Sequence, residues 1–263
     1  MFINIIYCII IFIKTKYLPF LEQCFIYFCN LTLYMSLKIK YLGHSSFIIN
    51  MNGTNILTDP YFDNKQVCSY NRLIDCALTI DKLPPIDSIL ISHEHFDAFD
   101  IDNTNLLVKK NKPKIIAHQS VLNKIDGFDS LKVPIDEYEK KTINDVCYYA
   151  HPAHHPTSFY PLSYVVSDKK NSFYFAGDTF MTREHENIKA DVAILPIGGK
   201  TTLDLISAVS VAKKIRPKYL IPMHYNTFDH IKQNPLALKE KFEGTRYTIK
   251  PVILAPGKEW NYK

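Results

Sequence analysis

The sequence lacks the features that would place the protein outside the cell, in a membrane or on nucleic acid. Its six cysteines show no paired C-x-x-C spacing, which indicates reduced thiols in a cytoplasmic protein. No basic run is interleaved with aromatic residues, and the net charge of +5 is modest and spread out, so no nucleic-acid partner is expected. No uninterrupted apolar stretch reaches the roughly 20 residues of a membrane-spanning helix, so stable membrane insertion is not expected either.

Residues 1–34 form an apolar and aromatic extension, interrupted by Lys14, Lys16, Pro19 and Glu22. The lysines follow the first apolar run instead of preceding it, and no small-residue cleavage site follows, which is unlike a signal peptide. Because Met35 opens directly onto the first expected strand, we expect synthesis to begin there and residues 35–263 to form one domain. A membrane-peripheral anchor is the alternative, and its short apolar face limits it.

What the chain does contain is enough apolar sequence, 47% of its residues, for one large core. Strand-like runs alternate with helical periodicity, which is typical of a layered α/β domain. Thr201 and Asp204 are spaced as an acidic capping box for a helix that runs to Ile215 and that Pro217 ends. Shorter helical segments are expected at 105–110 and 120–124.

The clearest chemical signal is His93-Glu94-His95-Phe96-Asp97, which follows the apolar run 89–91. Such a run is typical of a buried strand. Two histidines two residues apart just past a strand turn both imidazoles toward one point, and the aspartate approaches that point from the next bend. Zinc, iron and manganese accept these ligands. The stretch predicts a metal site, and a polar loop that merely contains two histidines is the alternative.

Other ligand-type residues also follow strand-like runs. The runs 146–150, 172–177 and 219–223 lead to His151, His154 and His155, to Asp178, and to His224. Two earlier runs lead to His44 and Asp59. Placement of so many ligand-type residues at strand ends predicts a single site along one edge of a sheet system.

Several separated motifs in this order resemble the metallo-β-lactamase superfamily. They are His93-x-His95-x-Asp97, His155, Gly177-Asp178-Thr179 and Pro222-Met223-His224-Tyr225. The resemblance is greatest to the branch of small single-domain hydrolases that includes the ascorbate-6-phosphate lactonase-like proteins, and it runs from about residue 35 to about residue 256. It implies an α/β fold, a four-layer αββα sandwich of the metallo-β-lactamase type with metals at one edge.

The resemblance also implies a role for each ligand-type residue. The first metal would take His93, His95 and His155, the bridging carboxylate would be Asp178, and the second metal would take Asp97 and His224. His155 is preferred to His154 because Pro152-Ala153-His154-His155 fits the family's Pro-Ala-x-His pattern. Asp59 is expected either to orient a ligand histidine by hydrogen bonding or to cap the turn before Pro60.

One residue departs from the family pattern, because Ala98 stands where the family has a histidine. A methyl group cannot bind a metal, so the second site would keep only Asp97, His224 and the bridging Asp178. We therefore expect one firm metal site and a weakened, oxygen-rich second one that favours manganese or iron. Asp100 is a substitute ligand that the sequence leaves open.

A site of this kind performs metal-assisted hydrolysis. A divalent metal, zinc first with manganese or iron as alternatives, lowers the pKa of bound water toward about 7 and polarises the bond to be cut. Asp97 is the candidate catalytic residue, because it can hold the attacking water in line. Two residues are candidates for substrate binding. Lys200 either meets a phosphate or carboxylate or is an exposed loop lysine, and His44 either lines the pocket mouth or hydrogen-bonds inside the core.

Three functions stay open at this point. The first is a metal-dependent hydrolase acting on a small polar ester, lactone or phosphate-bearing molecule. The second is a phosphodiesterase acting on a lipid or nucleotide, which an apolar groove around the site would favour. The third is a non-catalytic relative that binds a metal or ligand, for which Ala98 is the only support, since fold alone does not fix function. The oligomeric state, including a homo-oligomer, is not determined by the sequence.

Overall fold

The described part of the chain, residues 37–62 and 71–262 of a computed structural model, contains two seven-stranded β-sheets. These residues pack as one compact unit. The predictions for residues 1–34 lie outside the described residues. Within the described ranges, no helix is both long enough and apolar enough to cross a membrane.

The first sheet combines an antiparallel and a parallel half. Its order is β14 (Glu259–Asn261), β1 (Leu37–Gly43), β2 (Ser46–Met51), β3 (Thr54–Thr58), β4 (Ser88–Leu90), β5 (Lys114–Ala117) and β6 (Lys132–Pro134). Strands β14 to β3 pair antiparallel, whereas β3 to β6 pair parallel. Parallel pairing leaves the ends of β3 and β4 at the same edge, so the residues that follow them lie close together.

The second sheet repeats this plan. Its order is β13 (Lys250–Pro251), β12 (Tyr219–Met223), β11 (Val192–Pro196), β10 (Ser172–Phe175), β9 (Leu162–Ser167), β8 (Val146–Pro152) and β7 (Lys140–Ile143). Strands β7 to β10 pair antiparallel and β10 to β13 pair parallel. Strands β10 and β12 therefore also end at one edge.

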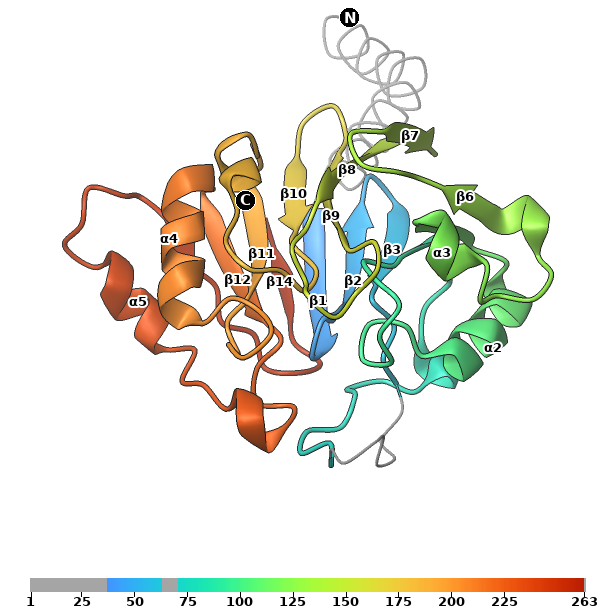
Figure 1. Ribbon diagram of the computed structural model, residues 1–263, viewed down its shortest axis with the longest axis horizontal. Helices are drawn as coiled ribbons and strands as arrows, with labels where there is room; N and C mark the ends of the chain where they lie inside the picture. Colours follow the sequence, from blue (N-terminus) through green and yellow to red (C-terminus); the bar gives the residue numbers. More distant parts are fainter. Residues whose placement is uncertain (1–36, 63–70, 263) are drawn as a thin grey trace, which may run out of the picture. The chain divides into compact units, whose positions relative to one another are not determined.

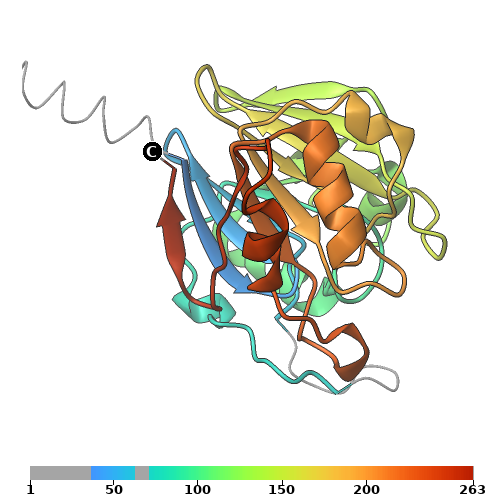
Figure 2. The ribbon, with the colours of Figure 1, turned by 90° about the vertical axis from the view of Figure 1, so that its left-hand side faces the viewer.

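Helices cover the outer faces of the two sheets (Figure 1). They are α2 (Ile101–Asn111), α3 (Gln119–Leu122), α4 (Leu205–Ile215) and α5 (Ala237–Phe242), with short 3-10 turns η1 (Ile80–Lys82), η2 (Asp129–Leu131), η3 (Arg183–Glu186) and η4 (Asp229–Ile231). Helix α4 packs on β11 and α3 on β5. In the orthogonal view, α4 and α5 lie on the near side and α2 and α3 on the far side (Figure 2). The architecture is the four-layer αββα sandwich that the resemblance implied.

The main core lies between the two sheets. On β1, Leu37 and Ile39 are fully buried, whereas Lys38 and Lys40, which alternate with them, are partly exposed. On β8, Val146 and Tyr148 are fully buried and belong to the same apolar cluster as the β1 residues. Each such side chain contributes about 1.5–3 kcal/mol when it leaves water, so the period-2 pattern explains why these strands bury their inner faces against each other.

The structure confirms the end of α4 and corrects its start. The helix ends at Ile215 as predicted, but its capping box joins Asp204 to Ser207, not Thr201 to Asp204. The side chain of Asp204 accepts a hydrogen bond from the Ser207 backbone N–H, which is one of the unpaired donors of the first turn. Helix α2, by contrast, begins earlier than predicted, at Ile101, because Asp100 caps it. Helix α3 spans only 119–122, where a segment at 120–124 was expected.

Candidate metal centre

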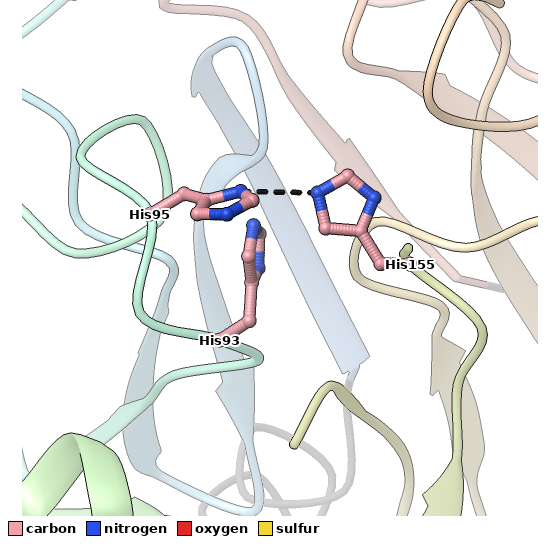
Figure 3. Close-up of side chains that lie close together, drawn as sticks. All are labelled: His93, His95 and His155. Atoms are coloured by element: carbon pink, nitrogen blue, oxygen red, sulfur yellow. Dashed lines mark hydrogen bonds between the residues drawn. The ribbon is translucent and has the colours of Figure 1, made fainter. Parts of the chain in front are cut away.

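Three histidines converge at one point of the sheet edge, and we call them the first metal group. His93 and His95 lie in the loop after β4, and His155 follows β8. Their ligand-type nitrogens lie within 4.8 Å of one another, and Nδ1 of His95 is 3.0 Å from Nε2 of His155. Figure 3 shows the three rings turned toward a common centre.

The hydrogen bonds around the first metal group fix which nitrogen of each ring carries the proton. Nδ1 of His155 is 3.1 Å from the Thr201 carbonyl, and Nε2 of His95 is 3.0 Å from the Thr157 carbonyl. A carbonyl oxygen can only accept, so these two nitrogens donate. With these tautomers the opposite nitrogens face each other at 3.0 Å with lone pairs, an arrangement that suits a cation bound by both.

Asp59 fixes the third ring through a serine. Its buried carboxylate accepts hydrogen bonds from the backbone N–H of Ser92, at 2.7 Å, and from the Ser92 hydroxyl, at 2.6 Å. Because that hydroxyl donates to Asp59, it accepts from Nδ1 of His93, 2.9 Å away. Nε2 of His93 is left as a buried lone pair without a hydrogen bond among the described residues. Asp59 thus contacts the candidate ligand His93 only through Ser92, and its role in orienting that ligand stays a prediction.

A second metal group lies beside the first and consists of His44, Asp97 and His224. His44 is in the turn between β1 and β2, Asp97 is in the loop after β4, and His224 follows β12. Oδ2 of Asp97 is 3.3 Å from Nε2 of His44 and 3.8 Å from Nε2 of His224.

Asp178, which follows β10, lies between the two groups. Its Oδ2 is 3.1 Å from Nε2 of His224 in the second metal group. The same oxygen is 3.8 Å from Nε2 of His93 and 4.0 Å from Nε2 of His155 in the first. Its Oδ1 is buried without a hydrogen bond among the described residues. This is the position that a bridging carboxylate requires, and the residues present fit a divalent metal.

The charges of the second metal group compensate one another. Burial alone would lower the pKa of His224, but the Asp178 and Asp97 carboxylates outweigh burial and raise it to about 10. The pKa of Asp97 lies well below its usual value because its contacts with His224 and His44 outweigh its burial. In the first metal group, burial lowers the pKa of His93 to about 4, so this ring is neutral at pH 7.

Glycines allow the loops to approach closely enough to form the site. A Cβ on Gly198 would lie 2.3 Å from the His224 carbonyl oxygen, and one on Gly177 would lie 2.6 Å from the Ser92 Cβ. Both distances are closer than side chains can approach, so glycine is required at both positions. The backbone of His44 (φ 55°) and of His224 (φ 52°) is left-handed, which costs free energy in a residue other than glycine and is common at functional sites.

A cavity of about 550 Å³ opens over both groups. Its lining comprises His95, Phe96, Asp97, His155, Thr157, Asp178, Lys200, Thr201, His224, Phe228 and His230. Lys200 therefore borders the cavity, and its contact with an anionic substrate group stays a prediction. His44 does not line it and is 1% exposed, so His44 lies beneath the cavity and not at its mouth.

The neighbouring ligand-type residues take other roles. His154 is exposed, and its ring packs near Phe180. His151 pairs with Glu184 at 2.9 Å. Asp100 caps α2 through hydrogen bonds from Asn103. Sequence reasoning missed His44 as a metal-group residue, as well as Ser92 and the cavity residues Phe96, Phe228 and His230; the only local signal for His44 was its position after a strand and Gly43.

This fold, with its histidine and aspartate groups at one sheet edge, defines the metallo-β-lactamase class of proteins. A family profile described as the beta-lactamase superfamily domain matches residues 38–224. A metal-dependent hydrolase of Nanoarchaeum equitans is 33% identical, and the match covers 79% of this chain and 92% of that one. One from Staphylothermus marinus is 35% identical, with 85% and 98% covered.

Among solved structures, a metallo hydrolase from Ignicoccus hospitalis has a TM-score of 0.76 and 24% identity over 87% of this chain and 99% of that one. The chain therefore belongs to the beta-lactamase superfamily and, with it, to the metal-dependent hydrolases that share this fold. The narrower resemblance to the ascorbate-6-phosphate lactonase-like branch stays a prediction.

Proposed function

We propose that this protein uses zinc to hydrolyse an ester, lactone or phosphate ester of a small polar molecule. The observation that carries the proposal is the orientation of His93, His95 and His155, each of which turns a lone pair toward one point. Three nitrogen donors with a fourth position open to the cavity are typical of catalytic zinc sites. A metal held there would act as a Lewis acid and would lower the pKa of a water molecule toward about 7.

In this proposal Asp97 holds the attacking water. Its carboxylate borders the cavity, with 15% of the side chain exposed. His44 and His224 keep its pKa low, so the group is ionised at neutral pH. An ionised carboxylate accepts a hydrogen bond from water and fixes the direction of attack. This role requires only the first metal group to be loaded.

The cavity supports a small substrate with an anionic group. Its volume of about 550 Å³ is in the range of small-molecule sites. Lys200 offers a cation at its border, where a carboxylate or phosphate of the substrate can pair with it. The two described cysteines, Cys76 and Cys147, are free thiols, which supports a cytoplasmic location.

A phosphodiesterase acting on a lipid is the second candidate. Phe96 and Phe228 line the cavity. On the loop that carries His155, Phe159 is 81% exposed. Apolar surface of this kind beside the metal groups suits an acyl chain.

The test compares three substrates with the full chain loaded with zinc: a carboxylate-bearing lactone, p-nitrophenyl phosphate and bis(p-nitrophenyl) phosphate. We expect hydrolysis of the first or second. His95→Ala should lower it about 1,000-fold, because a catalytic metal supplies several kcal/mol. His154→Ala is the matched control, since His154 is exposed and outside both groups. Cleavage of the diester alone would favour the second candidate, and equal rates in His95→Ala and the unchanged protein would exclude both.

A further inference from the structure

The second metal site that the resemblance implied, with Asp97, His224 and the bridging Asp178, lacks one ligand, and the neighbouring sequence cannot supply it. Ala98 is buried, with 2% exposure, and its methyl group offers no donor atom. Asp100 is held away by its hydrogen bonds to the backbone and side chain of Asn103 at the start of α2. Any additional donor for the second metal group must therefore come from a distant part of the chain.

His44 is placed to supply that donor. Its ring lies 4.2 Å from the His224 ring, measured between centroids, and packs edge-on against Tyr61 and Phe228. Its carbonyl accepts a hydrogen bond from the His224 backbone N–H at 2.9 Å. The aromatic walls and this backbone bond hold the imidazole in one position, so its Nε2 is directed at Asp97.

The distances match a coordination shell. Donor atoms bound tetrahedrally to one zinc at 2.0–2.1 Å lie about 3.3 Å from one another. Nε2 of His44 is 3.3 Å from Oδ2 of Asp97, and Nε2 of His224 is 3.1 Å from Oδ2 of Asp178. The donor atoms of His44, Asp97 and His224 all lie within 4.8 Å of one another.

A purely structural role for His44 does not account for its surroundings. The ring is 1% exposed, Nδ1 has no hydrogen-bond partner among the described residues, and the only polar contact of Nε2 printed for them is the 3.3 Å approach to the Asp97 carboxylate. A buried polar group without a partner costs about 1–3 kcal/mol. The left-handed backbone of His44 adds a further cost. A core position without a ligand would avoid the first cost with an apolar side chain and the second with a glycine.

We propose that His44 is a ligand of a second metal ion, together with Asp97, His224 and the bridging Asp178. His44, from the turn between β1 and β2, thereby takes the place of the family histidine for which Ala98 is substituted. The second site then has two imidazoles and two carboxylates, a set that zinc accepts, and not the oxygen-rich set that the sequence predicted. This inference rests on the proposed metal centre and is independent of the substrate.

The experiment is a zinc titration of the full chain after chelator treatment, by calorimetry, with elemental analysis of the dialysed product. The unchanged protein should bind two metals per chain. His44→Ala should keep the first and weaken the second at least about 100-fold, because even the loss of an outer hydrogen-bond partner costs about 10–100-fold. His44→Gln retains a polar side chain in the buried position and should weaken it similarly, so that a folding defect of His44→Ala cannot hide the result.

The outcomes separate this inference from the proposed function. The control variant His154→Ala should bind two metals with the affinities of the unchanged protein. Two tightly bound metals in both His44 variants would overturn the inference. One metal in the unchanged protein would also overturn it while leaving the proposed function in place. No metal in the unchanged protein would overturn both.

Discussion

The two metal groups lie side by side but are held in different ways. In the first metal group, every histidine has its second nitrogen fixed by an outer partner, namely Ser92, Thr157 or Thr201. In the second metal group, the nitrogens of His44 have no such partner among the described residues, and packing against aromatic rings and a backbone bond hold the ring. Hydrogen bonds therefore organise the first group, and charge balance and packing organise the second.

The largest effect is expected from a substitution of Asp178, the residue that lies between the two metal groups. Asp178→Asn leaves Oδ1 in place but replaces the charge that faces His93, His155 and His224. Both metals should bind more weakly, and hydrolysis should fall about 1,000-fold or more, since the site loses the negative charge that offsets two cations. Metal content and rate, measured on the same sample, check this expectation. Full loss of one metal with normal retention of the other would show that Asp178 belongs to a single group.

A smaller effect, on the metal affinity of the first metal group alone, is expected from a substitution of Ser92. Ser92→Ala removes the partner that fixes the His93 ring and leaves the Asp59 carboxylate with one hydrogen bond fewer. The affinity of the first metal group should fall about 10–100-fold, which is the usual effect of losing an outer partner, while the second group should keep its affinity. Ser163→Ala, another buried serine, is the control. Calorimetric titration provides the measurement, and equal weakening of both sites would show that Ser92 does not act on the first metal group alone.

The mildest test uses pH. In protein stripped of metal, the pKa of His224 lies at about 10, above the ordinary 6.5. At any pH between these two values, a metal that binds His224 must therefore displace a proton from its ring. The affinity of the second metal group should therefore rise about tenfold per pH unit from pH 7 to 9. The pKa of His93 is lowered to about 4, so this ring requires no proton release above pH 7. Titrations in buffers of different ionisation enthalpy count the released protons, and release on the first equivalent alone would reverse the assignment.

The parts of the site that sequence could predict are those in which spacing along one loop determines geometry. His93, His95 and Asp97 share the loop after β4, and the family's Pro-Ala-x-His pattern favoured His155, which lies in the first metal group, over the exposed His154. The sandwich could be predicted for a related reason, because alternating burial on strands such as β1 is visible in the residues themselves.

The position of His44 could not be predicted in this way. It depends on the contact between the turn after β1 and the loop after β12, two segments far apart in the sequence. Helix starts were missed for a more local reason. Asp100 and Asp204 cap α2 and α4 by bonding to residues three positions ahead, and several polar residues before each helix could have served equally well.

The two metal groups draw residues from both sheets, since His93 and Asp97 follow β4 whereas His155 and His224 follow β8 and β12. A metal bound at this edge would consequently cross-link the two halves of the sandwich, and its binding free energy would add to the free energy of unfolding. Removal of that metal would then lower activity and the free energy of unfolding together. The folded chain would then resist proteolysis for longer when metal is available than when it is scarce.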